Sequence, residues 1–237
     1  MLAIDRRWVA RVLWSVIAVL SFLHFVIVPA RLSGWSYVDL DAESGVGTWF
    51  ASFQLATAAA LVAGLALLRA RQGLSWRALA GLGLVLLVFS IEEVAAFHER
   101  LSSAVGGAVG TDDSTMGGTP IIGLVLLPFA VIGMRAVSKS ISPRCRAGIV
   151  AGAAIFGIAT FGIEQLESWN AQGELPLMRT MALTTSDSIL VGIQELGEMI
   201  GVAVILLVVL REWEVLGQAL AIRVMRNDER VQAVPDP

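Results

Sequence analysis

Long apolar stretches alternate with short polar connections along most of the chain. A helix needs roughly 20 apolar residues to cross a bilayer core about 30 Å thick. Six stretches reach or nearly reach that length. The pattern predicts an all-α, polytopic membrane protein: a single domain over residues 1–226, built as a bundle of six transmembrane helices, followed by a polar C-terminal tail over residues 227–237. The expected spans cover about residues 8–30, 48–68, 78–100, 119–137, 147–169 and 186–210.

Composition agrees with a chain surrounded by lipid. Of the 237 residues, 56% are hydrophobic and only 16% are charged, which is more apolar surface than a soluble fold of this length buries. The formal charge of -3 is small, and the basic residues lie in short clusters between apolar runs, so no nucleic-acid partner is expected. The single cysteine, Cys145, excludes an internal disulfide and a thiolate metal site.

Most of the arginines and lysines lie before the first predicted span or after the second, fourth and sixth, and the other connections hold few basic residues. Successive spans cross in opposite directions, so these clusters all lie on one side of the membrane, and positive residues favour the cytoplasmic side. We therefore predict that both termini are cytoplasmic and that the protein resides in the bacterial cytoplasmic (inner) membrane. The clusters are Arg6, Arg7 and Arg11; Arg69, Arg71 and Arg77; Arg135, Lys139, Arg144 and Arg146; and Arg211, Arg223 and Arg226.

Small residues at four-residue spacing predict where helices approach closely. Gly148 and Gly152 occur in the fifth span, and Gly197 and Gly201 occur in the sixth. Small residues let membrane helices pack backbone against backbone. We interpret these glycines, together with the alanine-rich run at residues 56–60, as structural residues of a tight bundle.

Several glutamates lie inside the predicted spans, where an ionised acid costs about 2.5 to 3.5 kcal/mol and is usually functional. By helical rise, the acids of the third span lie roughly 10 Å from its outer end, and those of the sixth roughly 14 to 18 Å from its outer start. Those of the fifth lie slightly nearer the surface. Three helices therefore supply acids to one layer in the outer half of the bilayer. These residues are Glu92, Glu93, Glu164, Glu167, Glu195 and Glu198.

Helical spacing limits which of these acids can share a site. Residues three apart lie on one face, so each Glu-x-x-Glu pair of the fifth and sixth spans acts together. Either Glu92 or Glu93 faces the same site, because the two point about 100° apart. His98 adds an imidazole, whereas His24 is interpreted as a packing or hydrogen-bonding residue. The candidate metal ligands are Glu92, Glu93, His98, Glu164, Glu167, Glu195 and Glu198.

Carboxylates with one imidazole suit a divalent metal ion, with Fe, Mn, Mg, Ca and Zn not distinguished by the sequence. The leading hypothesis is an intramembrane metal site, which would allow a metal-dependent membrane enzyme acting on a lipid-borne or small-molecule substrate. A second hypothesis is a proton- or cation-coupled transporter or channel that uses the same acids. A third is an accessory subunit of a membrane complex, whose acids bind a partner or the head groups of membrane lipid and perform no chemistry. Assembly as a homo-oligomer is also compatible with the sequence. The sequence leaves enzyme activity open and assigns no catalytic residue.

Two motifs resemble a family of bacterial multi-pass membrane proteins of unknown function. The first is an acidic pair followed by His-Glu at the end of a span, matched by Glu92, Glu93, His98 and Glu99. The second is Glu-x-x-Glu-Met-x-Gly in a later span. It is matched by Glu195, Glu198, Met199 and Gly201. The resemblance implies a polytopic membrane fold and carries no activity with it.

Overall fold

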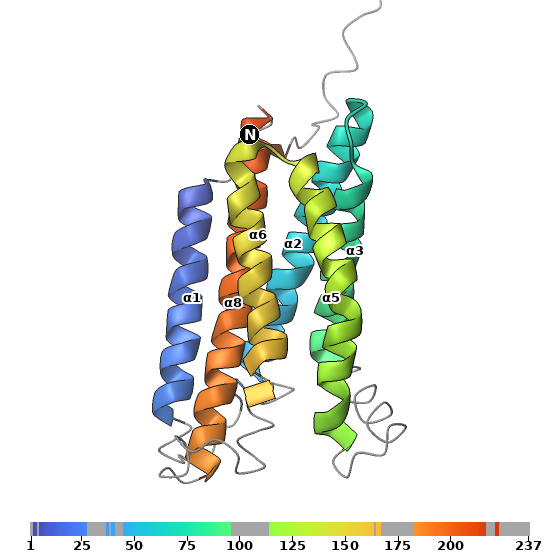
Figure 1. Ribbon diagram of the computed structural model, residues 1–237. Coiled ribbons are helices and arrows are strands. Elements are labelled where there is room, and N and C mark those ends of the chain that lie inside the picture. The colour runs from blue at the N-terminus through green and yellow to red at the C-terminus, as the bar shows by residue number, and fades with distance from the viewer. Residues whose placement is uncertain are drawn as a thin grey trace, which may run out of the picture.

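The computed structural model describes residues 2–3, 5–27, 37, 39–40, 45–95, 114–163, 165–166, 183–216 and 221–222. Its helices are α1 (Arg6–Ile27), α2 (Val46–Arg71), α3 (Arg77–Ala95), α5 (Ser114–Ser140), α6 (Pro143–Gly157), the π-helix η2 (Ile158–Ile163) and α8 (Leu183–Val215). They run alongside one another as an elongated bundle (Figure 1). The predicted all-α fold is confirmed. The described part adds to it only one short antiparallel pair, β1 (Leu2–Ala3) with β2 (Ala221–Ile222).

Six described helical segments are long and apolar enough to cross a membrane. They are Arg6–Val26, Val46–Arg71, Arg77–Ala95, Gly123–Ser140, Pro143–Ile163 and Ser188–Val215. Each overlaps one predicted span, so the number and order of spans agree with the sequence pattern. The fifth segment begins at Pro143 rather than residue 147, because proline suits the first turn of a helix. The predicted tail at residues 227–237 lies outside the described residues.

Helices α2 and α8 lie at the centre of the packing. Helix α2 packs against α3 and α8, and α8 also packs against α1 and α6. The main apolar cluster lies among α2, α3, α6 and α8, with contributions from the end of α5. A second cluster joins α1 to α2 and α8 through residues such as Ile17, Ala51 and Met199. Large side chains outside these clusters, such as Phe53 and Leu124, are mostly exposed, which suits a lipid environment.

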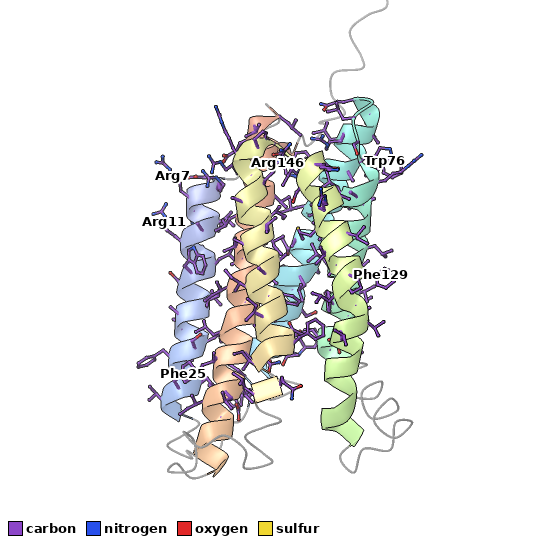
Figure 2. All side chains as sticks on the ribbon, viewed as in Figure 1. Arg7, Arg11, Phe25, Trp76, Phe129 and Arg146 are labelled. Atoms are coloured by element: carbon purple, nitrogen blue, oxygen red, sulfur yellow. The ribbon has the colours of Figure 1, made fainter. Side chains whose placement is uncertain are left out.

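The described residues of the predicted basic clusters lie at one end of the bundle, which we call the basic end, while Arg223 and Arg226 lie outside the described residues. Arg6 at the start of α1 lies 3.2 Å from a carboxylate oxygen of Glu214 near the end of α8. Arg69 near the end of α2 lies 3.6 Å from Glu212 of α8. Figure 2 shows Arg7, Arg11 and Arg146 at this end and Phe25 at the other. The charge asymmetry read from the sequence is therefore present in the fold, and the cytoplasmic location of this end stays a prediction.

The small residues predicted to bring helices together do so between α6 and α8. A methyl group built on Gly152 would lie 2.9 Å from the carbonyl oxygen of Gly201. A methyl on Gly197 would lie 2.7 Å from Ala159 Cβ. These distances leave no room for side chains, so the two helices approach backbone to backbone along this seam.

Candidate functional site

Two sets of interhelical hydrogen bonds fix the relative heights of α2, α3 and α8. Ser52 Oγ of α2 donates to the carbonyl oxygen of Ser90 in α3 at 2.7 Å, and Ser90 Oγ donates back to the carbonyl oxygen of Ser52 at 2.9 Å. Gln54 Nε2 of α2 donates to the carbonyl oxygen of Met199 in α8 at 3.1 Å. Ser90 is therefore level with Ser52, and Met199 is level with Gln54.

The glutamates of α3 and α8 lie in one layer by this measure. The heights of the four glutamates follow from the two hydrogen-bonded levels at a rise of about 1.5 Å per residue. Glu198 is the nearest of them to the basic end, and Glu93 is the furthest from it. Glu92 and Glu195 lie between them, and the whole layer is about 6 Å thick. We call it the acidic layer: Glu92, Glu93, Glu195 and Glu198. It lies in the half of the bundle away from the basic end.

The acidic layer borders the main apolar core on the side away from the basic end. Glu198 lies on the same face of α8 as Val202 and Ile205, four and seven residues later, and both are core residues. Its side chain is only 9% exposed. Glu93 shares a face of α3 with Leu86, seven residues earlier, which also belongs to that core. Glu93, rather than Glu92, therefore lies on the face of α3 that packs against the core. The sequence had left open which of the two acids faces inward.

Polar contacts hold the acids of this layer in place. Gln194 Nε2 donates to Glu198 Oε1 at 3.3 Å, one turn along α8. Glu92, Glu93 and Glu195 also interact with neighbouring groups. The side-chain oxygen of Gln54 is buried and accepts no hydrogen bond from the described residues, although its nitrogen is bonded. An unsatisfied buried oxygen is costly, so this atom is a candidate ligand for a positive group.

The remaining predicted ligands belong to parts of the chain that the structure leaves undescribed. His98, Glu164 and Glu167 all lie outside the described residues. Among the described residues, no three His, Cys, Asp or Glu side chains come close enough together to hold a metal ion. Helices α3 and α8 both pack on α2, and they carry the acids of the layer. A complete ligand set would need residues from beyond the described ranges.

A π-helix lies at the same height and was not expected from the sequence. Six residues, Ile158–Ile163, wind as η2 between α6 and Glu164. Ala159 of η2 packs on Gly197, next to Glu198. π-Helical turns are rare and occur frequently at functional sites. One step closer to the basic end, the ring of Phe156 in α6 packs edge to face against Phe89 of α3, with ring centroids 5.3 Å apart. This aromatic pair lies between the acidic layer and the main apolar core.

His24 is held by hydrogen bonds, as its interpretation from the sequence anticipated. Its side chain is 1% exposed, and Nε2 lies 2.8 Å from the carbonyl oxygen of Ser188 in α8. A methyl group on Gly192 would lie 2.7 Å from the same Nε2 atom. Position 192 of α8 therefore has room only for glycine, because the His24 side chain of α1 packs directly against it.

Substituting Gly192 with alanine is expected to separate α1 and α8 at the end of the bundle away from the basic end. The new methyl would meet the rings of His24 and Phe25, and overpacking of this kind costs about 1–3 kcal/mol. The loss should appear as a lower midpoint of thermal unfolding in detergent micelles. Gly81→Ala is the matched control, because nothing lies within 4 Å of a methyl group there. Equal midpoints for the two variants would contradict the close packing.

The fold and the acidic layer together define a multi-pass helical membrane protein with acidic residues inside its membrane-spanning bundle. The chain belongs to the family DUF8692, a domain of unknown function, whose match covers residues 8–212. That match covers the second to fifth spans completely and most of the first and the sixth. No curated protein and no solved structure matches the chain.

Proposed function

We propose that this protein binds one or two divalent cations in the acidic layer, with Glu93 and Glu198 as the inward-facing ligands. Glu92 and Glu195 lie in the same layer, and we further assign Glu164, Glu167 and His98 to the ligand set. Their carboxylate oxygens and the buried oxygen of Gln54 are the donors that hard divalent cations prefer. Iron, manganese and zinc also accept such ligands when an imidazole is present.

One observation carries the proposal: Glu198 is 9% exposed and faces the core at the level of the other acids. A carboxylate inside a membrane-spanning bundle is expensive, and such residues usually serve ions, protons or substrates. A cation that coordinates several acids of the layer would reduce the cost of burying all of them, because it offsets their mutual repulsion.

Binding from one side fits the fold better than passage across it. Between the acidic layer and the basic end, the interior is filled by apolar side chains of the main core, among them Val62, Leu65, Ile149 and Leu206. A transported cation would have to cross this region. We therefore favour a cation site that opens away from the basic end, with the basic end in the cytoplasm of a bacterial cell.

The metal content of the purified protein tests the proposal. Full-length protein, isolated in detergent without chelators, is expected to carry at least about one equivalent of a divalent metal by elemental analysis. Glu198→Gln and Glu93→Gln each remove a charged ligand while keeping the side-chain size. We expect each to weaken metal binding at least about tenfold, because even outer-shell substitutions cost 10- to 100-fold.

Glu214→Gln provides the matched control, because Glu214 is exposed at the basic end and pairs with Arg6. It should retain the full metal content. Wild-type protein that stays metal-free, and that binds none of Fe, Mn, Mg, Ca or Zn in titration, would overturn the proposal. Flux of a cation through proteoliposomes that disappears in Glu198→Gln would replace it with transport.

A further inference from the structure

His24 stands where three parts of the fold meet, at the end of the bundle away from the arginines. It belongs to the last turn of α1, and Figure 2 shows its neighbour Phe25 at that end. Its ring reaches Ser188 of α8 through Nε2 and residues 39–40 through Nδ1. The carbonyl oxygen of Ser188 can only accept, so Nε2 must carry a proton in every state of the ring.

The other ring nitrogen faces two partners with opposite requirements. The backbone N–H of Leu40 points to Nδ1 at an N to N distance of 3.2 Å, which requires a lone pair on Nδ1. Asp39 Oδ1 lies 3.1 Å from the same nitrogen, which requires a proton on Nδ1. A ring nitrogen satisfies one of these partners at a time. The neutral ring suits Leu40 and the imidazolium suits Asp39.

We propose that His24 and Asp39 form a proton-operated latch that controls how firmly residues 39–40 are held against α1, α2 and α8. With His24 neutral, Nδ1 accepts the Leu40 N–H. When His24 takes up a proton, Nδ1–H donates to the Asp39 carboxylate, and the Leu40 N–H loses its acceptor. The latch involves none of the proposed cation ligands and stands independently of metal binding.

Leu40 gives this exchange a mechanical consequence. Its side chain is 2% exposed and fills the second cluster beside Ala51 and Met199. A methyl on Gly47 would lie 2.6 Å from Leu40 Cδ2, so α2 also leaves space for this side chain. The Leu40 side chain therefore packs between α1, α2 and α8. The hydrogen bond from its backbone N–H to His24 holds the backbone of Leu40 in this position.

Among the side chains that the structure describes, Asp39 is the charged group that directly faces His24, and the side chain of Asp187, which precedes Ser188 in α8, is not among them. On α8 the nearest described acid toward the core is Glu195, three residues beyond Gly192 and about 4.5 Å further along the helix. The first turns of α2 present Thr48 and no charged residue, and on α1 the nearest charged group is Arg11, near the basic end. The Asp39 side chain is 30% exposed, so protons reach the pair from solvent at this end.

Hydrogen exchange of the Leu40 amide tests the latch in the full-length protein in detergent micelles. After correction for intrinsic exchange, we expect protection of this amide to fall about five- to tenfold from about pH 8 to about pH 5. That ratio corresponds to one hydrogen bond. The 15N resonances of the His24 ring, identified by their loss in His24→Gln, should change from the Nε2–H form to the doubly protonated form over the same range.

Two variants distinguish the latch from general acid destabilisation. Asp39→Asn removes the carboxylate that accepts from the doubly protonated ring, so the loss of Leu40 protection at about pH 5 should be smaller. His24→Gln should abolish the pH dependence of Leu40 protection. Unchanged Leu40 protection between the two pH values in the wild type would overturn the latch. So would a loss of protection that is the same in Asp39→Asn as in the wild type, or one that Glu195→Gln reduces instead.

Discussion

Replacing Glu212 with alanine is expected to lower the free energy of unfolding by about 3–5 kcal/mol, the range for removing one partner of a buried ion pair. The Glu212 side chain is 1% exposed near the end of α8. Its two oxygens accept the backbone N–H of Ser142 at 3.0 and 3.1 Å, and Oε1 lies 3.6 Å from Arg69 Nη1. One carboxylate therefore ties α8 to the end of α2 and the start of α6.

The position of Ser142 explains why this carboxylate matters. Ser142 is the N-cap residue of α6, and its own side chain makes no capping hydrogen bond. Glu212 instead caps the helix by accepting the N–H of Ser142 itself, and it places a negative charge near the positive end of the helix dipole. Without it, the Ser142 N–H and the Arg69 guanidinium both lose a buried partner at the basic end.

Unfolding in detergent, followed by circular dichroism, measures this effect against two comparison variants. Glu214→Ala lies two residues away and removes an exposed partner of Arg6, so it should cost no more than about 1 kcal/mol. Glu212→Gln keeps an oxygen acceptor for Ser142 and should fall between the two. If Glu212→Ala is no worse than Glu214→Ala, the capping role is wrong.

Replacing Gly201 with alanine is expected to cost more than the Gly192 substitution, toward the upper end of the range of about 1–3 kcal/mol for overpacking. A methyl group there would lie 2.7 Å from the backbone nitrogen of Phe156 and 2.8 Å from the carbonyl oxygen of Gly152. Backbone atoms cannot rotate away as a side chain does. Helices α6 and α8 must therefore separate along the seam, which also displaces Ala159 of η2 from Gly197.

The same unfolding measurement checks this effect. Gly157→Ala, near the end of α6, is the control, because nothing lies within 4 Å of a methyl group there. It should leave stability unchanged or raise it by about 0.5–1 kcal/mol, since alanine orders a helix more cheaply than glycine. A Gly201→Ala protein as stable as Gly157→Ala would show that the helices tolerate a wider separation.

Two buried glutamates on α8 illustrate how differently the chain uses the same residue type. Glu212 has a backbone N–H and an arginine as partners, which is sufficient reason for its burial. Glu198 is bonded by Gln194 and lies in a layer with other acids. The sequence pattern singled out Glu198 because it interrupts an apolar run. It passed over Glu212, which stands beside Arg211 and resembles an ordinary polar helix end.

By itself, the sequence determined the six apolar helices, the location of the described basic residues of its clusters at one end, and the small residues at which helices approach closely. The structure decided that the glycines of α6 and α8 meet each other. The sequence also placed Glu198 and the acids of α3 at similar heights. These properties depend on length, composition and spacing along single helices, where each residue advances a fixed rise and angle.

Only the tertiary structure decided how each helix is rotated toward its neighbours. That rotation turns Glu93 rather than Glu92 toward the core, and buries Glu212 against the start of α6. It also brings Asp39 and Leu40 back onto His24. Helical spacing relates residues within one helix, whereas the direction of a neighbouring helix depends on side-chain packing between segments far apart in the chain, which no local pattern records.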